Sequence, residues 1–148
     1  YNTAMSEWNN SSAEERLERW REFRESLTGL NDEELLNNVA QFFASVPLGA
    51  RCIDFYTPES WPTPWELLYH KLYCSSSISL LIYHTLCIAL GKDRVQIVLA
   101  DTGTDRLLMP VVDEKYILNY ELGKVNKIKD HSITIIDDFA DQEIEQVQ

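Results

Sequence analysis

Apolar residues recur at helical spacing in the first part of the chain. After a polar, asparagine-rich start, an apolar stripe runs along a charged segment at intervals of three and four residues: Leu17, Trp20, Phe23 and Leu27. Ser12 precedes this stripe and Gly29 follows it, which predicts an amphipathic helix. A second helix is predicted between Asp32 and Pro47, with an apolar face of Leu35, Leu36, Val39, Phe42, Phe43 and Val46. Together they predict a helical hairpin over residues 1–50.

The middle of the chain contains a strong helix start and the most apolar run. Residues 51–62 follow neither period and are predicted to form an ordered loop. A threonine, a proline and a glutamate then occupy the N-cap, first helical and capping-box positions of a short helix (Thr63, Pro64 and Glu66). The apolar run from Cys74 to Gly91 predicts a long, buried central helix.

Beyond this helix the apolar period changes to two, which is typical of strands. Four short runs are predicted as strands: Val95–Ala100, Arg106–Val112, Lys115–Tyr120 and Ile133–Ile136. Asp113 and Glu114 form a tight turn between the second and third. Helices followed by an antiparallel meander of three to four strands predict an α+β fold. We expect a single domain over residues 1–148, with a core at 51–136 and an acidic tail at 137–148.

Charge and composition exclude several classes of function. The chain has 148 residues, with 13 basic and 24 acidic side chains and a net charge of -11, which disfavours binding to nucleic acid or to anionic membranes. No uninterrupted apolar stretch is long enough to span a membrane. Three unevenly spaced cysteines do not predict a disulfide framework, which favours a reducing, cytoplasmic compartment. The chain begins at Tyr1, which leaves a preceding segment and secretion open.

Cys74 stands where a serine-rich segment turns into the central helix. A thiol in the first turn of a helix lies near unpaired backbone N–H groups and the positive end of the helix dipole, which favour the thiolate. Many cysteine hydrolases and acyltransferases use a thiol placed in this way. The opposite interpretation is a small buried residue at the helix start, since free cysteine is often buried.

The surroundings of Cys74 resemble a known family. A Trp61-Pro62-Thr63-Pro64-Trp65-Glu66 run, the cysteine that opens an apolar helix, Leu90-Gly91 at the end of that helix and a strand ending in Tyr116-Ile117-Leu118-Asn119 are similar to the core of transglutaminase-like proteins. The bacterial transglutaminase-like cysteine proteinases are the most similar group. The resemblance covers roughly residues 53–125. It implies a transglutaminase- or papain-like core with a catalytic cysteine, histidine and aspartate.

Applied to this chain, the resemblance implies an incomplete catalytic set. The nucleophile position falls on Cys74 and the aspartate position on Asn119, whose amide oxygen can still orient an imidazole. The acidic neighbours of the family's cysteine are replaced by Tyr73 and Ser75. The two-residue turn predicts that Leu108 lies opposite Asn119, so Leu108 or a neighbour occupies the histidine position. None of these side chains accepts a proton, so we expect a degenerate copy without its catalytic base.

The three histidines offer substitutes for that base. His84 is ten residues after Cys74, about 15 Å along the same predicted helix, and is out of reach. His70 approaches Cys74 if the helix runs unbroken, and His131 sits in a loop; the alternative is that the histidines face solvent. A zinc site formed by His70, Cys74, His84 and Cys87 is disfavoured, because one continuous helix spreads these ligands too far apart. Cys87 is expected in the core, and we expect no cofactor.

Aromatic residues gather before and around the short helix: Phe55, Tyr56, Trp61, Trp65, Tyr69 and Tyr73. They form either a lid packed over the helices or an anchor surface for a partner, because aromatic residues dominate interface energetics. We expect a catalytically degenerate domain that binds protein partners or has a structural role in a larger assembly, for which a phage particle or its assembly machinery is one setting, cytoplasmic or within the virion. Two alternatives are an active thiol hydrolase or acyltransferase that uses Cys74, and an acidic inhibitor of a basic target.

Overall fold

The computed structural model describes residues 11–44, 46, 58–70 and 74–139. Within these residues, four α-helices precede five strands: α2 (Ala13–Ser26), α3 (Asp32–Ala44), α4 (Pro64–His70), α5 (Ser75–Leu90), β1 (Val95–Asp101), β2 (Arg106–Val112), β3 (Tyr116–Leu118), β4 (Val125–Lys127) and β5 (Thr134–Asp138). This is the α+β class that the sequence predicts. No helix in the described residues is both long enough and apolar enough to cross a membrane.

Local capping signals set the helix starts. Ser12 and Glu15 form a capping box at α2, in which each side chain accepts a hydrogen bond from the other residue's backbone N–H. Thr63 and Glu66 exchange the same pair of bonds at the start of α4. Gly91 ends α5 with a φ of 98°, in the region that favours glycine. The capping predictions for these helices are confirmed.

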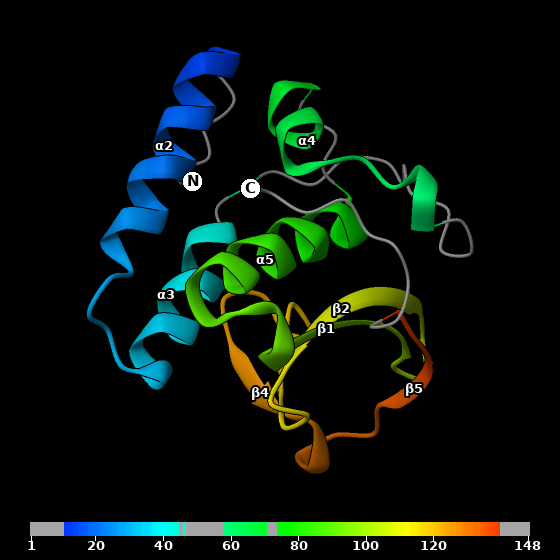
Figure 1. Ribbon diagram of the computed structural model, residues 1–148. Coiled ribbons are helices and arrows are strands. Elements are labelled where there is room, and N and C mark those ends of the chain that lie inside the picture. Colours follow the sequence, from blue (N-terminus) through cyan, green and yellow to red (C-terminus); the bar gives the residue numbers. More distant parts are fainter. Residues whose placement is uncertain (1–10, 45, 47–57, 71–73, 140–148) are drawn as a thin grey trace.

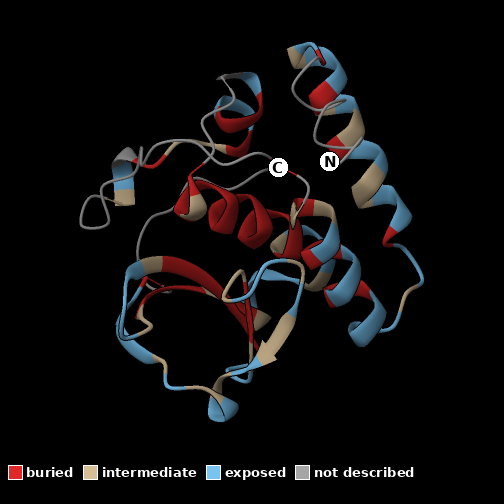
Figure 2. Ribbon diagram, turned by 180° about the vertical axis from the view of Figure 1, so that it is seen from behind, coloured by how far each residue is buried: buried red, intermediate tan, exposed pale blue. Residues whose placement is uncertain are grey.

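The long helix α5 lies between the other helices and the sheet (Figure 1). Figure 2 shows it as the most continuously buried element, and its burial extends from Ser76 to Leu86. On the side of α5 that faces the other helices, the Trp20 indole Nε1–H donates a hydrogen bond to the Thr85 hydroxyl at 2.9 Å. On the sheet side, Leu99 and Leu108 belong to the same fully buried cluster as Leu81. The predicted central helix is therefore the centre of the core.

The sheet is antiparallel, with the strand order β4-β3-β2-β1-β5. The first three strands form the predicted meander, and β4 extends it beyond β3. The last strand, predicted as the fourth, crosses to the other edge and pairs with β1. β4 was not predicted, because Val125–Lys127 is short and does not alternate. A second buried cluster, containing Val98, Met109 and Ile117, fills the face turned away from α5.

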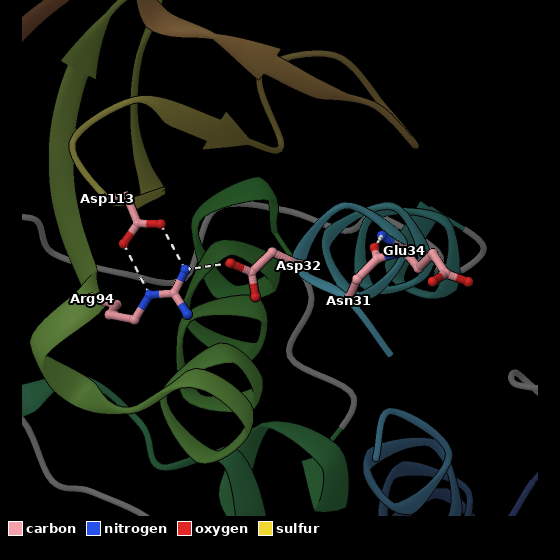
Figure 3. Close-up of polar contacts among 5 residues, drawn as sticks. All are labelled: Asn31, Asp32, Glu34, Arg94 and Asp113. Carbon is pink, nitrogen blue, oxygen red and sulfur yellow. Dashed lines mark hydrogen bonds and ion pairs between the residues drawn. The ribbon is translucent and has the colours of Figure 1, made fainter. Parts of the chain in front are cut away.

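An ion-pair corner joins three elements near the end of α5 (Figure 3). Arg94 donates from Nε and Nη2 to the Asp113 carboxylate, at 3.0 and 2.7 Å, and from Nη2 to Asp32 at 2.7 Å. The hydrogen bonds from Arg94 to Asp113 hold the pKa of the Asp113 carboxyl below its ordinary value. Asn31 caps the adjacent start of α3 by accepting the Glu34 N–H at 2.9 Å. The corner fixes the first turn of α3 relative to the turn between β2 and β3.

Candidate functional site

Cys74 is the N-cap residue of α5 and is 5% exposed. Its Sγ accepts a hydrogen bond from the Ser77 backbone N–H at 3.4 Å and lies 3.1 Å from the Ser77 hydroxyl oxygen. The Cys74 N–H donates to that same oxygen at 3.4 Å. The sulfur therefore replaces the hydroxyl of an ordinary N-cap serine, close to the positive end of a 16-residue helix. The predicted position of Cys74 at the start of the central helix is confirmed.

Two strands meet this first turn of α5. The backbone N–H of Leu108, on β2, donates to the Ser76 hydroxyl at 3.3 Å, and the Leu108 side chain is fully buried. Asn119 follows β3 with a φ of 65°, and its Nδ2 donates to the Ser75 carbonyl and to the Ser79 hydroxyl, both at 2.9 Å. The helix start, Leu108 and Asn119 are thus brought together, as the family pattern implies.

The predicted register between Leu108 and Asn119 is one residue off. Val112 pairs with Tyr116 and Val111 with Ile117, so continuing the ladder would set Met109 opposite Asn119. The cause is Lys115, which adds one residue to the predicted two-residue turn. β3 also ends before Asn119, whose positive φ turns the chain out of the ladder.

His84 and His131 occupy different environments. His84 is 2% exposed, with its ring against Tyr83, so the prediction that it faces solvent is wrong. Its Nδ1 has no hydrogen-bond partner among the described residues, and burial lowers its pKa from 6.5 to about 4. His131 lies against the Tyr120 ring, with its Nε2 3.2 Å from Asn126 Nδ2.

His70 is the last residue of α4, and its side chain lies outside the described part of the structure. The backbone of Cys74 is extended, with φ -100° and ψ 174°, and α5 starts only at Ser75, so no unbroken helix carries His70 to Cys74. Cys87 is only half-buried, because it lies on the last turns of α5 where Ile88 is already 41% exposed. Burial still raises the pKa of the Cys87 thiol to about 11. Among the described residues, no three His, Cys, Asp or Glu side chains are grouped to hold a metal ion.

The predicted aromatic cluster divides between the core and the surface. Trp61 is 7% exposed and packs edge-on against Phe139, with ring centroids 5.0 Å apart. Trp65 is 44% exposed and meets the Trp20 ring at 5.3 Å, while Tyr69 is 58% exposed on the same short helix. Trp61 therefore belongs to the core, and Trp65 and Tyr69 form an outward aromatic face. Three members of the predicted cluster, Phe55, Tyr56 and Tyr73, lie outside the described residues.

A buried arginine that the sequence analysis did not single out anchors α4. Arg16 is 3% exposed and donates from Nε to the Leu68 carbonyl at 2.6 Å and from Nη2 to the Tyr69 carbonyl at 2.9 Å. Nη1 donates to the Ser11 carbonyl at 2.5 Å. The guanidinium thus caps the C-terminal end of α4, where the helix dipole favours a cation. The sequence feature that could have identified Arg16 as buried is its position four residues before Trp20, which places it on the core-facing side of α2.

Comparison with solved structures defines the class of fold. No protein-family model matches the sequence, and no curated protein matches it either. Calcium-bound LapG from Legionella pneumophila superposes with a TM-score of 0.72 at 18% identity, over 88% of this chain and 77% of the LapG chain. LapG treated with EGTA gives 0.71 at 16% identity, over 92% and 79% of the two chains.

LapG is a transglutaminase-like cysteine protease, and the likeness at this identity is one of fold. The chain therefore has a transglutaminase-like fold, in agreement with the resemblance of its sequence. Its five-stranded sheet and N-terminal helices fit the same class.

Proposed function

We propose that this chain is a transglutaminase-like domain without thiol catalysis, which acts by contact with other proteins. The single observation that carries the proposal is the environment of Leu108. This fully buried leucine joins β2 to the first turn of α5 through its backbone bond to Ser76. The resemblance puts the family's imidazole at Leu108 or at a neighbour such as Met109, which the observed register, continued past β3, sets opposite Asn119. Neither of these side chains removes the proton of a thiol or returns one to a leaving group.

The polar groups around Cys74 support a structural role. Ser77 shares hydrogen bonds with the sulfur, but a serine hydroxyl is too weak a base to activate a thiol. The Asn119 amide nitrogen donates to Ser75 and Ser79, so this side chain fastens the end of β3 to α5. Each of these groups has a structural task that needs no substrate.

The competing function is an active cysteine hydrolase or acyltransferase. Two observations favour it: Cys74 sits at the start of a long helix, and the fold is that of a cysteine protease. In this alternative Cys74 attacks a carbonyl, Asn119 orients the base, and His70, His131 or a partner's residue supplies that base.

Alkylation separates the two functions. The intact chain is treated with iodoacetamide at a series of values from about pH 5 to about pH 9, and peptide mass spectrometry measures the rate at each cysteine. Our proposal predicts slow labelling of Cys74 at acidic pH and no effect of His70→Gln or His131→Gln. Rapid labelling of Cys74 near pH 6 that either substitution abolishes would contradict it. Cys87, whose pKa is raised by burial, is the internal reference for a slow thiol.

Two features support contact with proteins. The outward aromatic face of α4, Trp65 and Tyr69, offers side chains of the kind that dominate interfaces. The net charge of -11 favours a basic partner, and binding through charge weakens with added salt, whereas binding through the aromatic face does not. Membership of a phage particle or its assembly machinery, and the role of an acidic inhibitor, stay predictions.

A further inference from the structure

We propose that a pocket between α2, the start of α3 and the end of α5 binds a small aliphatic carboxylic acid, whose carboxylate pairs with Arg24. This α2–α5 pocket has a volume of about 510 Å³. Its lining comes from the second half of α2, the turn that follows it, the first turn of α3 and the last turns of α5. Pockets of this volume hold ligands of small-molecule size. The inference goes beyond the proposed role in protein contact and does not depend on the state of Cys74.

Arg24 provides the positive charge of the site. Its guanidinium lies over the ring of the fully buried Trp20, with Cζ 4.4 Å from the ring centroid. Its Nε is covered and has no acceptor, and the guanidinium forms no hydrogen bond or ion pair with any described residue. Burial lowers the pKa of Arg24, which Glu25 opposes only in part, but an arginine stays protonated. The fold therefore holds a cation at the pocket without supplying its counter-ion.

The second arginine of the lining, Arg94, is already neutralised. It donates to the Asp113 carboxylate at 3.0 and 2.7 Å and to Asp32 at 2.7 Å, and Figure 3 shows both carboxylates directed at its guanidinium. Only the charge of Arg24 is left over, which matches a ligand with one negative charge. A polyanion would meet Asp32, which also lines the pocket, and the net charge of -11 of the whole chain. The charge balance thus favours a monocarboxylate.

The apolar part of the lining defines the body of the ligand. It consists of the aliphatic residues Leu27, Leu30, Leu35, Ile88, Ala89 and Leu90. Leu27 and Leu35 are only 3% and 5% exposed, so the pocket reaches the core, whereas Ile88 leaves 41% of its surface exposed. A bare inorganic anion would leave this surface in water, and an aliphatic chain would cover it. Charge and lining together specify a carboxylate on an aliphatic body.

The test is an NMR titration of the intact, isotope-labelled chain with octanoate, a monoanion with an aliphatic chain. The signals to follow are the backbone amides of Gly29 and Ala89 and the side-chain Nε–H of Arg24. We expect these signals to shift, with half-saturation below about 10 mM. Octanamide keeps the chain and lacks the charge, and acetate keeps the charge and lacks the chain. Each should bind about tenfold more weakly than octanoate, or more weakly still.

Substitutions at Arg24 separate the charge from the fold. Arg24→Gln should weaken octanoate about tenfold and leave octanamide unchanged, because only the charged ligand loses a partner. Arg24→Lys keeps the charge without the planar fork, so it should retain part of the preference for octanoate. Lys124→Gln removes the same charge at an exposed position outside the pocket, and should have no effect beyond a small change that salt removes.

Several results would overturn the inference. Equal binding of octanoate and octanamide, or an octanoate affinity that Arg24→Gln leaves unchanged, would mean that Arg24 holds no carboxylate. The first of these comparisons needs no substitution, so it decides the question even if a variant does not fold. Shifts confined to residues outside the pocket, or none at about 10 mM, would mean that the pocket does not take the acid. Tighter binding of a short peptide with a free C-terminal leucine would make a protein C-terminus the occupant. None of these results affects the alkylation test of Cys74.

Discussion

The buried histidine of α5 makes the stability of the protein depend on pH in a calculable way. His84 is 2% exposed and burial lowers its pKa to about 4, against 6.5 for the ordinary side chain. The unfolded chain therefore binds a proton at this residue more readily than the folded chain does. Linkage then requires that the free energy of unfolding falls as the pH drops below about 6.5, and that the loss levels off below the folded pKa.

The size of the effect follows from the two pKa values. With about 1.4 kcal/mol for each pKa unit, the loss is about 2 kcal/mol at pH 5 and approaches about 3 kcal/mol near pH 4. Carboxylates also titrate in this range, so the measured quantity is a difference between two proteins. Urea denaturation at about pH 7.5 and about pH 5 is compared for the wild type and His84→Leu. The wild type should lose about 2 kcal/mol more than the variant over this interval.

A substitution at a second histidine, His131, is the control for this measurement. His131→Leu, which removes a histidine that is only partly buried, is the matched control for the loss of an imidazole. If His84→Leu also keeps the full acid sensitivity of the wild type, His84 does not stay neutral in the fold and this reasoning about its burial is refuted.

Two further substitutions test the core and the anchor of α4. Leu81→Ala should lower the free energy of unfolding by about 2–5 kcal/mol, since the side chain is fully buried, and Ile88→Ala on the same helix should cost about 1 kcal/mol or less. Equal costs in urea denaturation would mean that α5 is not central. Arg16→Met should cost about 2–5 kcal/mol, because the Leu68 carbonyl and its neighbours lose their donor. Arg21→Met, at an exposed position of the same helix, should change stability by less than about 1 kcal/mol; a similar loss for both variants would refute the anchoring role.

Local chemistry made most of the helices predictable from the sequence. The capping box of α2 and that of α4 involve residues three apart, so they are visible in any short stretch of sequence. The central helix was visible as an apolar run that starts at Cys74 and ends at Gly91. These features depend on neighbours in the chain, which is why a single sequence reveals them.

Features that depend on distant parts of the chain were predicted less well. The extra residue at Lys115 shifts the β2–β3 ladder by one position, and nothing in the apolar alternation reveals it. β4 was missed because only its pairing with β3 makes this short segment a strand. The position of β5 was missed because the sequence does not show which strand it pairs with, and it pairs with β1 at the far edge of the sheet.

The positions of the candidate site residues were predictable in part. Leu108 and Asn119 do contact the first turn of α5, which Cys74 caps, although the strand register was predicted one residue off. The burial of His84 was missed because α5 is buried on nearly all sides, so the polar residues on it do not mark a solvent face. Arg16 was missed because a charged residue on an amphipathic helix is normally exposed, and only the carbonyl groups of α4 explain its position.

The central proposal is that no histidine activates the Cys74 thiol, and the ultraviolet absorbance of the thiolate tests it most directly. In a Cys52→Ser, Cys87→Ser variant, Cys74 is the only thiol, and its titration is followed with and without His70→Gln and His131→Gln. Our account predicts that the curves coincide and that no thiolate absorbance persists at about pH 5. A thiolate signal that persists at this pH and disappears with either histidine would establish an ion pair and contradict the account.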